Sequence, residues 1–273
     1  MSIVTEMFSF PFMVRALIAG GIISLCAALL GVSLVLKRFS MIGDGLSHVG
    51  FGALAIAAAL NVAPLFVSIP VVVIFAFLLL RLNEKARIKG DSAIALVSTS
   101  ALAIGVVILS LTTGMTTDVN NYMFGSILAI SKSDMIIAII AGIVILGLFA
   151  WFYHRIFLVT FDESFARASG INTNGYQVLL SILTAVTIVL GMRLMGALLI
   201  SSLIIFPALT SMQVFKKYSH VIISSGVISI VCFLVGLVLS YVFSLPTGAS
   251  IVVANMVLFG VFFLIGFIGR KNG

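Results

Sequence analysis

Residues 12–36 read FMVRALIAGGIISLCAALLGVSLVL, and this stretch decides the class of fold. Arg15 is the only charged side chain within it. A helix of about 20 mainly apolar residues spans the hydrocarbon core of a bilayer, which is roughly 30 Å thick. The stretch therefore predicts a transmembrane helix, and most of the remaining chain has the same character.

The composition excludes an ordinary soluble protein. Of the 273 residues, 62% are hydrophobic and 8% are charged, and the mean hydropathy is +1.34, whereas a soluble domain carries about 25% charged residues. The net charge is +7, but the basic residues are scattered and form no contiguous patch, so we expect no nucleic acid partner. We predict an all-α polytopic membrane protein with a single transmembrane domain, residues 1–273, surrounded by lipid.

Nine apolar stretches are candidates for membrane spans, although 175–192 is short and eight spans are the alternative. Residues 118–130, DVNNYMFGSILAI, are too short to cross and predict a helix that lies at the interface or dips in and returns. The nine stretches are 12–36, 41–61, 64–81, 92–112, 134–153, 175–192, 194–213, 219–243 and 248–269.

Lys and Arg are divided unevenly between the two sides that nine spans create. Three of them, Arg15, Lys132 and Arg193, fall on one side, and twelve fall on the other. Cytoplasmic loops are enriched in Lys and Arg, so we expect the N-terminus outside and the C-terminus in the cytoplasm of a cell membrane. The twelve are Lys37, Arg38, Arg81, Lys85, Arg87, Lys89, Arg155, Arg167, Lys216, Lys217, Arg270 and Lys271.

The sequence contains none of the motifs GxxxxGK[ST], HExxH or GxSxG, which mark phosphate-binding loops, zinc proteases and serine hydrolases. We therefore expect no enzymatic activity and no permanently bound cofactor. A pump or transporter built on this chain would take its energy from a partner protein or from an ion gradient.

One polar pair lies inside a predicted span. In SMIGDGLSHVGFG, residues 40–52, Asp44 and His48 are four apart and so share one face of a helix. Counted from Arg38 at about 1.5 Å per residue, His48 lies roughly 15 Å into the membrane. A carboxylate and an imidazole make half of a site for a divalent transition metal, and two copies across a two-fold axis would complete it. An internal Asp–His hydrogen bond and a proton relay are the alternatives.

The connection at 154–175 contains FDESFARASG, residues 161–170, which predicts a short amphipathic helix. Phe161, Phe165 and Ala168 would line one side of it. Asp162 and Glu163 would lie at its positive N-terminal end, and Gly170 is a plausible stop. A helix lying on the lipid surface is the alternative interpretation.

Four stretches together resemble one family, the permease subunits of bacterial ABC transporters for zinc and manganese (the ABC-3 family). The resemblance covers nearly the whole chain. The sequence departs from the family pattern at SLPTG, residues 244–248, which lacks a preceding acid. The four stretches are LVLKRFSMIGDGLSHV at 34–49, FGSIL at 124–128, FDESFARASGI at 161–171 and LMGALLISSLIIFPA at 194–208.

This resemblance implies a helix bundle of the type shared with cobalamin and siderophore importers, present as a homodimer in the bacterial cytoplasmic membrane. Asp44 and His48 would contact the transported zinc, manganese or iron, which a binding protein would deliver from outside. Cytoplasmic ABC ATPase subunits would dock on the coupling segment. The residues implied for that segment are Phe161, Asp162, Glu163, Phe165, Ala166, Arg167 and Gly170.

Two other functions remain open at the level of sequence. A permease for a metal chelate, such as a siderophore or cobalamin, would not need Asp44 and His48 as direct ligands. A gradient-driven metal carrier would need no ATPase. The sequence does not decide between zinc, manganese and iron, because imidazole and carboxylate ligands suit all three.

Overall fold

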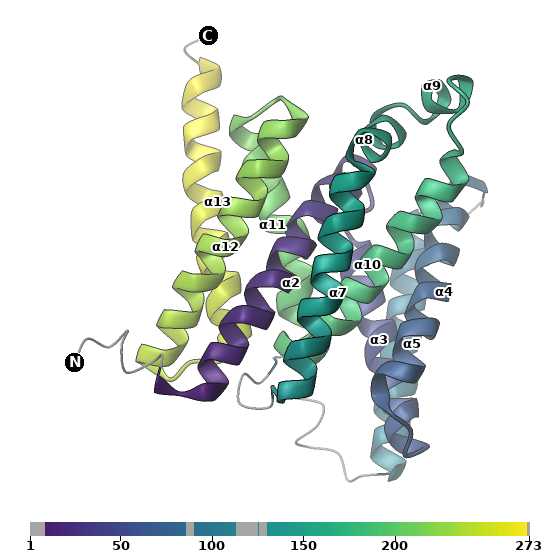
Figure 1. Cartoon of the computed structure of the whole chain (residues 1–273), viewed down its shortest axis with the longest axis vertical. Coiled ribbons are helices and arrows are strands. Elements are labelled where there is room, and N and C mark those ends of the chain that lie inside the picture. The colour runs from purple at the N-terminus through teal and green to yellow at the C-terminus, as the bar shows by residue number, and fades with distance from the viewer. Residues whose placement is uncertain (1–8, 86–89, 113–124, 126–129, 272–273) are drawn as a thin grey trace.

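The apolar stretches form long helices in the computed structural model, which describes residues 9–85, 90–112, 125 and 130–271 (Figure 1). Within these ranges every regular element is an α-helix, since only a helix satisfies the backbone of a single crossing segment internally. The helices are α2 (Pro11–Leu36), α3 (Ile42–Ala59), α4 (Pro64–Lys85), α5 (Gly90–Thr112), α7 (Lys132–Trp151), α8 (Tyr153–Phe161), α9 (Glu163–Ala168), α10 (Thr173–Met195), α11 (Ala197–Val214), α12 (Tyr218–Phe243) and α13 (Thr247–Lys271).

The predicted spans correspond in order to nine of these helices. In the described part of the chain, eight helices are long and apolar enough to cross a membrane, and Pro64–Leu79 of α4 is a shorter apolar helix. By length and composition the described helices therefore fit the alternative of eight spans, and the shorter segment is the one expected at 64–81 and not the one expected at 175–192, where α10 has 23 residues. The interfacial or re-entrant helix predicted at 118–130 falls largely outside the described residues.

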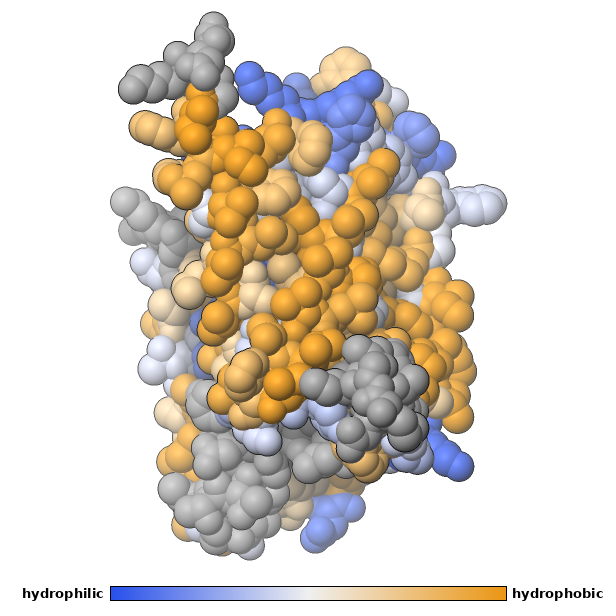
Figure 2. Space-filling view, turned by 90° about the vertical axis from the view of Figure 1, so that its left-hand side faces the viewer, coloured by the Kyte–Doolittle hydropathy of each residue, from blue (hydrophilic) through white to orange (hydrophobic). Residues whose placement is uncertain are grey.

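The helices differ in how deeply they are buried. The most apolar segments of α2, α3, α10 and α11 are 61–72% buried, whereas those of α5, α7 and α13 are 11–22% buried. On the side of α13, Figure 2 shows a broad apolar surface with hydrophilic side chains gathered near its two ends. This distribution is typical of a bundle whose outer helices face lipid.

Glycines let the central helices approach closely. A Cβ built on Gly31 of α2 would lie 2.0 Å from the carbonyl oxygen of Ile204 in α11. A Cβ on Gly52 of α3 would lie 2.8 Å from the carbonyl oxygen of Ala101 in α5. Contacts between backbones of this kind are a common way to associate helices in lipid, where the hydrophobic effect gives no preference for protein neighbours.

Among the described basic side chains, Arg15 and Arg193 lie at one end of the bundle and Arg167 at the other. Arg15 Nη1 donates to the carbonyl oxygen of Ile130 at 3.3 Å, and Arg193 Nη2 lies 2.9 Å from Asp134 Oδ1, both near the start of α7. Arg167 belongs to α9, at the other end, toward which α2 and α13 run (Figure 1). The two ends are thus chemically distinct, as the charge count predicted.

Candidate functional site

The pair Asp44 and His48 lies near the beginning of α3. His48 Nε2 is 3.7 Å from Asp44 Oδ1, which is longer than a hydrogen bond. The direct Asp–His hydrogen bond considered from the sequence is therefore not formed between these two atoms. Both side chains point along one face, as expected for residues one helical turn apart.

These two residues are the accessible positions in the first fourteen residues of α3, Ile42 to Ala55. From Ile42 to Ala55 every residue of α3 is buried except Asp44, whose side chain is 47% exposed, and His48, at 18%. The remaining faces of the helix are packed against α4, α5, α10 and α11. The carboxylate and imidazole therefore open onto space outside the bundle of this single chain.

His48 lies about two helical turns from the start of α3. Residues from Lys37 to Met41 form the turn between α2 and α3, and α3 begins at Ile42. Counting 1.5 Å per residue from Ile42 places His48 about 9 Å along α3. The depth of His48 in the bilayer, counted from Arg38 in the sequence, stays a prediction.

Within one chain the pair does not make a complete metal site. In the described part of the chain no group of three or more His, Cys, Asp and Glu side chains is placed to hold a metal ion. Ser47 is also buried, and its hydroxyl donates to the carbonyl oxygen of Asp44 at 2.7 Å. One chain thus offers one imidazole and one carboxylate, the half-site anticipated from spacing.

The segment 161–170 contains one short helix, α9, as predicted, but Phe161 is not part of it: Phe161 is the last residue of α8. Asp162 is extended, with φ −146° and ψ 92°, and it separates Phe161, the last residue of α8, from α9. Asp162 Oδ1 accepts a hydrogen bond from the backbone N–H of Phe165 at 2.8 Å. The spacing of Phe161 and Phe165 suits a continuous helix, but Asp162 is a strong N-cap and starts a new one.

The predicted end of this segment is confirmed. Gly170 has a φ of +79° and its N–H donates to the carbonyl oxygen of Arg167, while the N–H of Ile171 donates to that of Ala166. This pair of bonds is the Schellman motif, which favours glycine because its left-handed conformation costs other residues energy. The short helix α9 is therefore fixed at both ends by its own sequence.

Two aromatic side chains flank the start of α9 on the surface. Phe161 is 56% exposed and Phe165 57% exposed, whereas Ala166 is fully buried. Phe161 also packs against Phe157 and Tyr218, with ring centroids 4.9 and 5.7 Å away. Two apolar side chains are thus exposed at the junction of α8 and α9, one on each helix.

Glu163, the first residue of α9, makes contacts that the sequence did not indicate. Its Oε1 lies 3.0 Å from Arg167 Nη2, and its Oε2 accepts a hydrogen bond from Gln177 Nε2 at 2.8 Å and lies 3.8 Å from Lys37 Nζ. Lys37 was assigned only as one of twelve basic residues on one side. Because Lys37 and Gln177 are remote in sequence from Glu163, no sequence motif predicts these contacts.

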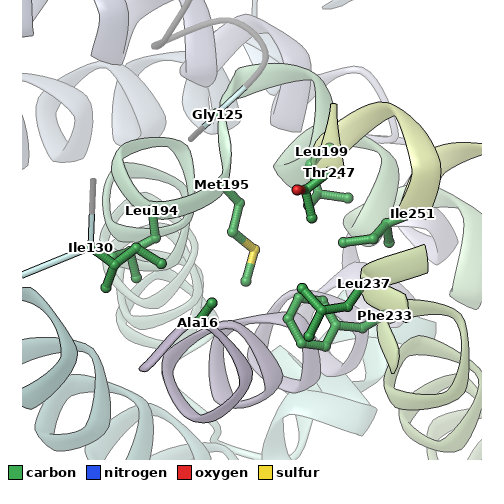
Figure 3. A pocket seen from close by; sticks show the side chains of 11 residues that line it. Ala16, Gly125, Ile130, Leu194, Met195, Leu199, Phe233, Leu237, Thr247 and Ile251 are labelled. Carbon is green, nitrogen blue, oxygen red and sulfur yellow. The ribbon is translucent and has the colours of Figure 1, made fainter. Parts of the chain in front are cut away.

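A separate cavity lies at the opposite end of the bundle, between α2, α10, α11, α12 and α13 (Figure 3). It holds about 20 Å³, room for roughly one water. Met195 points into it, and the hydroxyl of Thr247 is paired with that of Ser240 at 2.8 Å. The described lining offers a cation no carboxylate, imidazole or thiolate, so this cavity does not compete with Asp44 and His48.

The chain matches one family of known proteins over most of its length. The model of the ABC 3 transport family matches residues 9–266. The chain is similar to the high-affinity zinc uptake system membrane protein ZnuB of Haemophilus influenzae, at 31% identity over 92% of this chain and 96% of the relative. It is also similar to the manganese transport system membrane protein MntC of Listeria monocytogenes, at 29% identity over 94% and 92%.

A solved structure extends the likeness to three dimensions. PsaBC from Streptococcus pneumoniae, in complex with a Fab, matches with a TM-score of 0.86 and 28% identity, over 96% of this chain and 94% of that chain. The arrangement of helices described above is therefore one that an experimental structure also contains.

Proposed function

Since this chain belongs to the ABC 3 transport family, we propose that it is the membrane-spanning permease subunit of an ATP-binding cassette importer for a divalent transition metal, zinc or manganese. The observation that carries this proposal is the family match across residues 9–266. The names of two relatives, one a zinc and one a manganese system, support the choice of cargo.

Asp44 and His48 are the cargo-contacting pair in this proposal. Zinc and manganese both accept imidazole nitrogen and carboxylate oxygen as ligands. An ionisable side chain that faces hydrocarbon is unfavourable, so the half-exposed carboxylate of Asp44 needs water or protein in front of it. A second copy of the chain related by a two-fold axis would cover this face and would bring a second imidazole and carboxylate.

The short helix α9 is the contact for an ATPase partner. Its exposed Phe165 and the neighbouring Phe161 offer apolar surface at the end of the bundle richest in Lys and Arg, which is the cytoplasmic end by the positive-inside rule. Hydrolysis by the partner would supply the energy, and a binding protein would deliver the metal at the opposite end. The N-terminus then lies outside and the C-terminus in the cytoplasm.

Uptake of radioactive zinc and manganese tests the cargo site. In cells that depend on this chain, Asp44→Asn and His48→Ala should each lower uptake by more than about tenfold, since even the outer partners of metal ligands matter by 10–100-fold. His220→Ala is the matched control, because His220 is exposed near the start of α12. Unchanged uptake in both site variants at equal membrane abundance would refute the assignment.

Co-purification tests the ATPase partner. Phe165→Asp should release the ATPase from the detergent-solubilised complex, because the carboxylate cannot be desolvated at an apolar contact. Phe243→Asp makes the same change at an exposed phenylalanine that ends α12 near the other end of the bundle and should retain the ATPase. If no ATPase accompanies the unaltered chain and uptake collapses with the ion gradient, the gradient-driven carrier is the correct function.

A further inference from the structure

Glu163 connects α9 to two membrane-spanning helices. Its Oε2 accepts a hydrogen bond from Gln177 near the start of α10 at 2.8 Å and lies 3.8 Å from Lys37 Nζ at the end of α2. Its Oε1 lies 3.0 Å from Arg167 of α9 itself. Both carboxylate oxygens are thus engaged, one within α9 and the other across to the bundle.

Lys37 stands on a tight turn that leads directly into α3. The N–H of Arg38 donates to the carbonyl oxygen of Val35 at 3.0 Å, and the N–H of Phe39 donates to that of Leu34 at 2.8 Å. Arg38 is left-handed, with a φ of 62°, so the turn is a Schellman motif with arginine in place of the usual glycine. This turn makes the connection between Lys37 and α3 short, and the first turn of α3 carries Asp44.

The contact between Lys37 and Glu163 borders a cavity of about 250 Å³. The cavity lies between the end of α2, α8, α9 and α10, and the lysine side chain is 10% exposed and the glutamate 30%. Charges sealed in an apolar core would be costly to separate. Beside a space of this size they can stay hydrated, and α9 has room to move relative to α2.

We propose that Lys37 and Glu163 form a latch that transmits movement of α9 to the α2–α3 turn and so to Asp44. This inference rests on the proposed function, in which an ATPase docks on α9. Neither residue contacts the cargo in this scheme; both position the helix that holds it. Gln177 provides a second attachment, from the same carboxylate oxygen to α10.

The ratio of metal transported to ATP hydrolysed tests the latch, measured on the intact complex of permease and co-purified ATPase in proteoliposomes with radioactive zinc or manganese. Lys37→Met keeps most of the side-chain volume and removes the charge. It should lower that ratio about tenfold, within the range typical of couplings between sites, while the ATPase still co-purifies and still hydrolyses ATP. Lys37→Arg keeps the charge and should retain the ratio.

Lys217→Met is the matched control, because Lys217 is exposed at the start of α12, at the same end of the bundle, and it should leave the ratio unchanged. A Lys37→Met variant with an unaltered ratio would overturn the latch. So would a variant that loses hydrolysis and uptake in equal proportion, because that indicates a general structural defect. Absence of any ATPase from the unaltered chain would overturn the proposed function instead, and the latch with it.

Discussion

Removing the side-chain cap of α9 should loosen this helix and leave the membrane-spanning bundle intact. Asp162 Oδ1 accepts the N–H of Phe165 at 2.8 Å, and α9 has only six residues. Replacing an Asp N-cap by Ala costs about 1 kcal/mol, which is about a fivefold change in the equilibrium between formed and frayed helix. Asp162→Ala should therefore raise the frayed population of α9 about fivefold.

Hydrogen–deuterium exchange of the chain in lipid nanodiscs measures that population directly. Exchange of backbone amides in α9 should be about fivefold faster in Asp162→Ala, because local opening governs exchange. Asp162→Asn is the informative control, since asparagine caps a helix as well as aspartate does but carries no charge. It should exchange at nearly the unaltered rate, and the amides of α2 and α10 should not change in either variant.

Two results would refute the reasoning. Equal acceleration in Asp162→Ala and Asp162→Asn would mean that the negative charge near the helix N-terminus, and not the hydrogen bond, stabilises α9. No acceleration in either variant would mean that the contacts of Glu163 and the turn at Gly170 hold the helix without a cap.

Two further predictions concern the bundle. Gly31→Ala should lower the thermal stability of the purified protein, because the added Cβ would meet the carbonyl oxygen of Ile204. Gly21→Ala on the same helix is the control: a Cβ there would have nothing within 4 Å, so this change should be neutral or stabilising. Equal melting temperatures of the two variants would contradict the close approach of α2 and α11. Ser229→Ala should cost about 0.6 kcal/mol in a denaturant titration, because its hydroxyl donates across to the carbonyl oxygen of Ser24 at 2.9 Å. Ser224→Ala loses only a bond within its own helix and should cost less, and the reverse order would contradict the interhelical role.

The features that could be predicted from sequence are those with a short repeat or a fixed length. Apolar length sets the helices, and α12 at 218–243 was expected at 219–243. The four-residue spacing of Asp44 and His48 placed both on one face of α3. Gly170 ends α9 because a left-handed residue is needed there, and glycine is the residue that adopts it most easily.

The rest depends on local competition or on distant contacts. The spacing of Phe161 and Phe165 fits one helix, and only the preference of Asp162 for the N-cap position breaks it. Glu163 lies 126 positions after Lys37, and no periodicity in a single sequence relates residues so far apart. The covering of α3 by four other helices, which leaves only the polar pair accessible between Ile42 and Ala55, is likewise a consequence of tertiary packing.

The packing of α3 indicates which parts of the bundle move together in transport. Its contact with α5 is close at glycines of both helices: a Cβ on Gly105 would lie 3.0 Å from the Cα of Gly52 and 2.9 Å from the ring of Phe51, and a Cβ on Gly45 would lie 2.6 Å from Cγ2 of Ile94. Close packing of this kind leaves little room for the two helices to slide past each other, so we expect α3 and α5 to shift as one unit. The contact between Lys37 and Glu163 consists of flexible side chains beside a cavity. In the proposed scheme a movement that begins at α9 reaches the α2–α3 turn through that contact, and α3 carries it to Asp44 and His48.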